Sequence, residues 1–200
     1  MAVKNTINFV ILSVNDMSQK TEDSISMLQN ALFYNKRSFV TDALSLTNEI
    51  RERKDKLTKE LEVAAESDPE LKVYISIPAH LGRVSDLINN IADSISSKID
   101  KQLLFSDKAV SELTFLLQRI KEILNTLTDY ILARNTFIAS YLKESEQEIE
   151  RSATKFSTLH EERLIEGICT TNASTLYVQM LDAIKGIAWH TRKIAEELIS

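Results

Sequence analysis

An all-α fold is predicted by three features of this chain: few turn-forming residues, regularly spaced apolar residues, and sufficient length. Its 200 residues include only 3 Gly and 2 Pro, so signals for β-turns are rare. Apolar residues recur every three or four positions, as they do on one face of an α-helix. With 44% hydrophobic residues, the chain can bury a sizeable core as one large domain or two small ones.

The helices are delimited by the apolar pattern and by capping residues. Asp68 is a candidate N-cap, and Pro69 suits the first position of the helix that follows. Pro78 lies inside that same helix and should bend it, because its ring removes a hydrogen-bond donor. Gly167 is the expected C-terminal cap of the fifth helix. The expected helices span residues 7–32, 38–65, 69–99, 106–134, 136–166 and 172–199.

The third and sixth helices repeat one apolar pattern at an offset of about 103 residues. Val73-Tyr74 aligns with Leu176-Tyr177, and Ile91-Ala92-Asp93 aligns with Ile194-Ala195-Glu196. Each of these helices begins after a break that is marked by capping residues, and each is the last helix in a group of three. The chain is therefore interpreted as two tandem, antiparallel three-helix bundles, residues 1–103 and 104–200, which together form one domain.

Charge and cysteine content exclude several classes of protein. The net charge of −5 comes without a basic stripe, which argues against binding to nucleic acid. Cys169 is the single cysteine, so the chain can form no internal disulfide, and we expect a buried, small side chain there. The longest apolar run, residues 7–14, is far too short to cross a bilayer. These features favour a cytoplasmic location.

The third helix carries one candidate metal site. Polar residues recur there at spacings of four, three and four, which places them on one face apart from the apolar stripe. The face comprises Gly82, Asp86, Asn89, Asn90 and Asp93. Carboxylate and amide oxygens with this spacing can converge on a hard cation, and the candidate ligands are Asp86, Asn90 and Asp93. The alternative is an ordinary solvated face.

The corresponding part of the sixth helix is basic. Lys185 and Lys193 would oppose a divalent cation, and Trp189 offers a single donor, so we interpret this region as a basic face with a packed indole. The three histidines, His80, His160 and His190, show no metal-ligand spacing. Neither a Glu-x-x-His motif nor a phosphate-binding glycine loop occurs, and nothing in the sequence specifies catalysis.

Two segments resemble the PhoU family. The stretch "LGRVSDLINNIAD" resembles the metal-binding helix of PhoU-like proteins, and "HEERLIEGIC" resembles a segment of PhoU domains attached to sodium/phosphate cotransporters. The first match rests on Leu81, Arg83, Val84, Asp86, Asn90, Ile91, Ala92 and Asp93, and the second on His160, Arg163, Leu164, Gly167 and Cys169. The resemblance implies a pair of three-helix bundles and a non-enzymatic role in regulating inorganic phosphate uptake.

The family's metal motifs are altered in this chain. Many PhoU-like proteins bind iron or zinc through two E/D-x-x-x-D motifs, but Gly82 replaces the leading acid of the first motif. In the second, Lys185 and Trp189 replace both acids. We therefore expect a metal-free second site, where Lys185 or Lys193 supplies the positive charge. The resemblance leaves at most one weakly bound iron or zinc, at Asp86, Asn90 and Asp93.

The resemblance implies docking to the cytoplasmic face of a membrane phosphate transporter, or to a signalling protein. PhoU-like proteins often dimerise, so a homodimer is a further expectation. The alternative is a general helical adaptor unrelated to phosphate, for which the mixed-charge helices are equally suited. A metal-dependent helical enzyme is the third hypothesis, which the broken acidic motifs disfavour.

Overall fold

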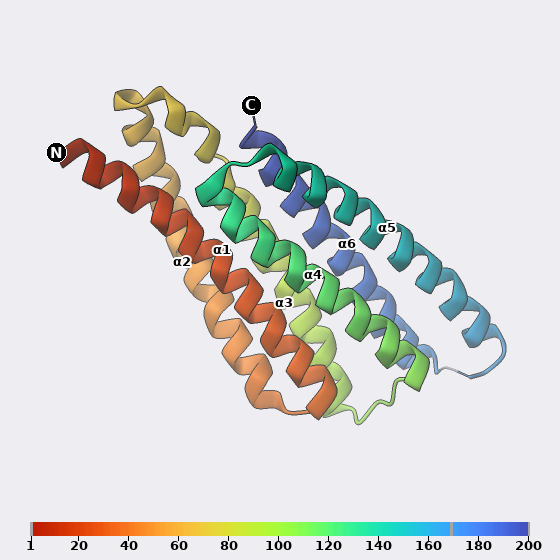
Figure 1. Ribbon diagram of the computed structural model, residues 1–200. Coiled ribbons are helices and arrows are strands. Elements are labelled where there is room, and N and C mark those ends of the chain that lie inside the picture. Colours follow the sequence, from red (N-terminus) through yellow and green to blue (C-terminus); the bar gives the residue numbers. More distant parts are fainter. Residues whose placement is uncertain (1, 169, 200) are drawn as a thin grey trace.

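The structure of the chain is a computed structural model, which describes residues 2–168 and 170–199 and, for residues 2–7, the backbone alone (Figure 1). Cys169 lies outside the described residues. Within them the chain forms six α-helices and one short 3₁₀ helix, with successive long helices running antiparallel. They are α1 (Ala2–Tyr34), α2 (Arg37–Ser67), η1 (Pro69–Tyr74), α3 (Ile77–Asp100), α4 (Asp107–Ala133), α5 (Thr136–Ile165) and α6 (Thr171–Glu197).

Local sequence explains where several of these helices begin and end. Ser106 caps α4 by accepting a hydrogen bond from the backbone N–H of Ala109 at 3.2 Å. Gly167 follows α5 with a positive φ of 73°, a conformation that glycine adopts without strain. The N–H of Gly167 then bonds to the carbonyl of Leu164, and that of Ile168 to the carbonyl of Arg163. This Schellman motif confirms the predicted C-terminal cap.

The predicted single bent helix over residues 69–99 is wrong, because the chain breaks before Ile77. Asp68 caps only the short η1, where its carboxylate accepts from the N–H of Glu70 at 3.1 Å. Pro78 occupies the first turn of α3, where its missing donor costs no helical hydrogen bond. The proline therefore starts a new helix instead of bending an existing one.

One continuous apolar core runs through all six helices. Helices α1, α2 and α3 pack together, α4, α5 and α6 pack together, and the contacts of α1 with α4 and α3 with α6 join the two sets. The division at residues 103 and 104 remains an interpretation, because the core crosses it. On α5, Leu164 is 36% exposed, while His160 is buried.

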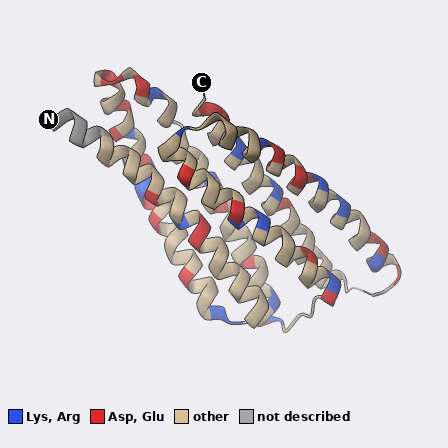
Figure 2. Ribbon diagram, in the orientation of Figure 1, with Lys and Arg blue, Asp and Glu red and all other residues tan. Residues whose placement is uncertain are grey.

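Acidic and basic residues alternate along the helices without separating into one acidic and one basic region (Figure 2). No helix formed by the described residues is both long and apolar enough to cross a bilayer.

Candidate functional site

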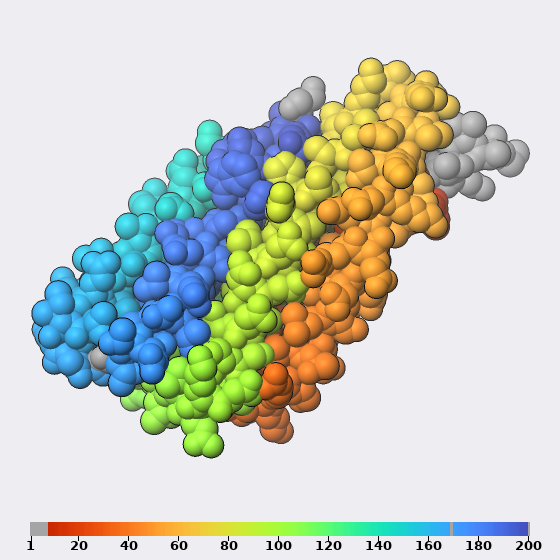
Figure 3. Space-filling view, turned by 180° about the vertical axis from the view of Figure 1, so that it is seen from behind, coloured from red at the N-terminus to blue at the C-terminus, as the bar shows by residue number. Residues whose placement is uncertain are grey.

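Helices α3 and α6, which carry the predicted metal ligands and the basic residues, lie side by side on one face of the molecule (Figure 3). The two helices run antiparallel, with α2 on the far side of α3. Gly186 allows α6 to approach α3 closely, because a Cβ at that position would lie 2.8 Å from Leu87 Cδ1. The close approach brings together side chains that are more than a hundred residues apart in sequence.

Asp86 lies between two arginines on the side of α3 that faces α2. Its carboxylate is 3.7 Å from Arg51 Nε and 3.7 Å from Arg83 Nη1, and the side chain is 47% exposed. The neighbouring Asn89 accepts a hydrogen bond from the Thr47 hydroxyl of α2 at 2.7 Å. These contacts direct both polar side chains toward α2.

Asn90 and Asp93, the other two predicted ligands, are exposed and line a groove between α3 and α6. The groove has a volume of about 620 Å³ and is also lined by Gln179 and Asp182. Asp182 already pairs with Lys185 Nζ at 2.8 Å. Asp86 does not line the groove, so the structure leaves the three predicted ligands on two sides of α3.

Gly82 is buried beneath an extended lysine, and its predicted place on a solvated polar face is wrong. The aliphatic stem of Lys54 crosses it, so that a Cβ on Gly82 would lie 2.6 Å from Lys54 Cδ. The missing side chain at Gly82 leaves room for the Lys54 stem to lie against α3. The predicted polar face is thus divided between a buried glycine, residues that face α2, and residues in the groove.

The residues on this face do not fit a divalent metal site. Asp86 is flanked by two guanidinium groups, and Asp182 is paired with an ammonium group. Among the described residues, no three His, Cys, Asp or Glu side chains are grouped so that they could hold a metal ion. Metal sites need several converging anionic or neutral donors, whereas Asp86 and Asp182 each lie beside a cation.

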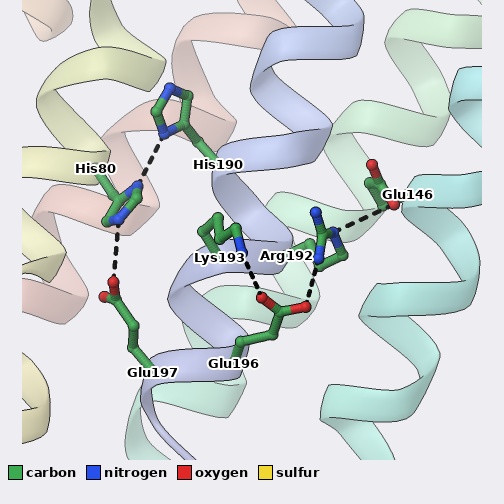
Figure 4. Close-up of polar contacts among 7 residues, drawn as sticks. All are labelled: His80, Glu146, His190, Arg192, Lys193, Glu196 and Glu197. Atoms are coloured by element: carbon green, nitrogen blue, oxygen red, sulfur yellow. Dashed lines mark hydrogen bonds and ion pairs between the residues drawn. The ribbon is translucent and has the colours of Figure 1, made fainter.

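On α6 the basic residues are neutralised by nearby acids. Lys193 Nζ is 2.9 Å from Glu196, which also pairs with Arg192, and Arg192 Nε reaches Glu146 of α5 at 3.4 Å (Figure 4). The indole of Trp189 is expected from the sequence to be packed, but it is 41% exposed. Lys193 Nζ lies 5.5 Å from the centroid of its ring.

His80 of α3 and His190 of α6 form a pair that the sequence pattern does not reveal. Their Nδ1 atoms are 2.8 Å apart, and His80 Nε2 is 3.2 Å from a carboxylate oxygen of Glu197 (Figure 4). Ser76 holds the same carboxylate through a hydrogen bond. Burial, followed by the charges of His80 and Arg83, lowers the pKa of His190 to about 4.

The histidine pair is a chain of hydrogen bonds and not a converging set of ligands. Both ring nitrogens of His80 are already engaged, one by His190 and one by Glu197. The arrangement can fix the register of α3 against α6. Sequence reasoning missed it because His80 and His190 are separated by 110 positions and meet only through helix packing.

Comparisons with known proteins support the PhoU resemblance. Residues 14–95, from α1 into α3, match the PhoU domain family. The fold is similar to that of PhoU from Pseudomonas aeruginosa, with a TM-score of 0.88 at 14% identity over 98% of this chain and 96% of that one. It is also similar to the phosphate transport system regulatory protein PhoU from Streptococcus pneumoniae, with a TM-score of 0.86 at 14% identity over 98% of this chain and 95% of that one. No curated protein matches the chain. The predicted family resemblance and all-α, PhoU-like fold are confirmed.

Proposed function

We propose that this PhoU-like chain is a non-catalytic regulatory protein of inorganic phosphate transport. The observation that carries the proposal is the match of residues 14–95 to the PhoU domain family. The similarity of fold to a phosphate transport system regulatory protein agrees with it. We further propose that the chain acts at the inner face of the membrane, by docking to a phosphate transporter.

The docking proposal is tested by isolating the tagged chain together with its partners from cross-linked membranes of its source cell. Recovery of a phosphate transporter, together with altered phosphate uptake when the chain is removed, is the expected result. Recovery of a cytosolic signalling partner alone, with unchanged phosphate uptake, would instead support a general helical adaptor.

We also propose that the chain's own cations take the place of a metal at the altered motifs of α3 and α6. Support comes from Arg51 and Arg83 beside Asp86, and from Lys185 beside Asp182. Positive charge at these positions offsets the repulsion among nearby carboxylates, which a divalent cation could otherwise relieve.

Elemental analysis after incubation with iron or zinc and gel filtration tests this second proposal. We expect less than one equivalent of metal per chain. If a weak site does exist at Asp86, Asp86→Asn should abolish the residual metal, whereas Asp100→Asn, on the same helix but paired with Arg37, should not change it. Two or more retained equivalents would overturn the proposal.

A further inference from the structure

A second, smaller cavity lies at the end of the bundle where α4 and α6 begin. Figure 1 shows the first turns of these two helices at the same end of the molecule. The cavity has a volume of about 250 Å³. Its wall includes Ser106 and Thr170, the residues that precede the two helices, together with His160 of α5 and apolar side chains such as Phe105 and Ile168.

His160 is a buried imidazole without a hydrogen-bond partner. The residue is 3% exposed, and neither ring nitrogen has a hydrogen-bond partner among the described residues. Its ring stacks on that of Tyr177, with the centroids 4.2 Å apart. Nearly all buried polar groups in proteins are hydrogen-bonded, so an unpartnered imidazole on a cavity wall is a candidate hydrogen-bond donor to a ligand.

The polar groups on the cavity wall can all donate hydrogen bonds. Thr170 makes no side-chain capping bond to α6, which leaves the N–H groups of the first turn without that partner. The hydroxyls of Ser106 and Thr170 can also donate. No Asp or Glu is among the described residues that line the cavity. The first turn of a helix attracts anions through its N–H groups and its dipole.

The charges behind the cavity wall balance each other. Arg163 binds the buried carboxylate of Glu112 through both terminal nitrogens, at 3.1 and 2.7 Å, and the hydroxyl of Tyr177 donates to the same carboxylate at 2.6 Å. Burial, followed by the charge of Arg163, lowers the pKa of His160 despite the opposing charges of Glu112 and Glu161. A neutral imidazole still offers one N–H donor.

We propose that this cavity binds a small oxyanion of the phosphate or sulfate class. The anion accepts hydrogen bonds from His160, from the two hydroxyls and from the first turn of α6. The cavity is smaller than the roughly 300–1,000 Å³ of sites for drug-sized ligands, so the ligand is the free inorganic anion and not a phosphate group on a larger molecule. This site does not depend on whether the chain docks to a transporter.

Binding is tested by titrating the full chain with inorganic phosphate, with sulfate and with phenyl phosphate at constant ionic strength, while following the imidazole resonances by NMR. We expect the inorganic anions to shift the His160 resonances and raise its pKa, and phenyl phosphate to have no effect. A response to phenyl phosphate at lower concentration than to inorganic phosphate would overturn the assignment to the free anion.

His160→Phe keeps the stacking on Tyr177 but removes the donor, and it should weaken phosphate binding by about 10- to 100-fold. His80→Phe, at the other end of the bundle, is the matched control and should bind as the wild type does. Wild-type His160 resonances that do not respond to either inorganic anion would overturn the proposal, whether or not the variants fold.

Discussion

Charged residues pair at both ends of α6, but they are buried at its beginning and exposed to solvent at its end. At its beginning, Tyr177 meets a carboxylate and an arginine that are shielded from solvent, with 2% and 13% of the Glu112 and Arg163 side chains exposed. At its end, Glu196 binds Lys193 and Arg192 with 37% of its side chain exposed. The first end has one buried charge pair, and the second has a network in contact with water. We therefore expect substitutions at the first end to cost more stability.

The histidines follow the same division. His190 and His80 are hydrogen-bonded to each other near the end of α6, whereas His160, near the beginning of α6, has no hydrogen-bond partner among the described residues. A paired imidazole fixes the packing of two helices, but an unpaired one retains a donor for a ligand. The difference lies in the surroundings and not in the residue type.

The largest effect is expected for Glu112→Gln. It removes the buried charge that Arg163 and Tyr177 bind, and it should lower the free energy of unfolding by about 3 kcal/mol. Glu196→Gln is the matched substitution at the other end and should cost at most about 1 kcal/mol. Urea unfolding measures both, and equal losses would contradict the comparison.

Tyr177→Phe should lower the free energy of unfolding by about 2 kcal/mol, because it removes a hydrogen bond to a buried carboxylate. Burial and Glu112 raise the pKa of the Tyr177 hydroxyl, so it stays protonated at neutral pH and remains a donor. Tyr141→Phe, a partly exposed tyrosine on α5, is the control and should unfold at the same urea concentration as the wild type.

At the end of α6, stability should depend on pH through His190. Its pKa in the folded chain is about 4, below the ordinary value of 6.5, so the unfolded chain binds more protons between these values. The free energy of unfolding should therefore fall as the pH drops from 6.5 toward 4, by about 1–2 kcal/mol for this partly buried ring. His190→Phe should flatten this part of the stability profile, and an unchanged slope would contradict the assignment.

The smallest effect is expected between the two ends, where α6 rests on α3. Gly186→Ala should cost about 1 kcal/mol, because overpacking against Leu87 exceeds the gain in helix propensity. Gly82→Ala is the matched control, since the flexible stem of Lys54 can move aside, and it should be nearly neutral. Thermal unfolding compares the two variants, and a greater loss for Gly82→Ala would reverse the interpretation.

The sequence by itself determined the helices, because helix formation depends on nearby residues. The spacing of apolar residues predicted all six long helices, and Ser106 and Gly167 marked ends that the structure confirms. The motif around Asp86 also led to the PhoU resemblance. Pro78 misled the prediction, since a proline that begins a helix and one that bends a helix look alike in sequence.

Only the tertiary structure decided how the candidate sites are composed. Helical spacing placed Gly82 and Asp86 on one polar face, but it could not show that Lys54 would bury the first and that Arg51 would pair with the second. Nor could it show that His80 meets His190 or that His160 faces a cavity. These contacts join different helices, so they depend on how the helices pack. The close approach of α3 and α6 sets the histidine pair, and the start of α4 beside the start of α6 sets the cavity.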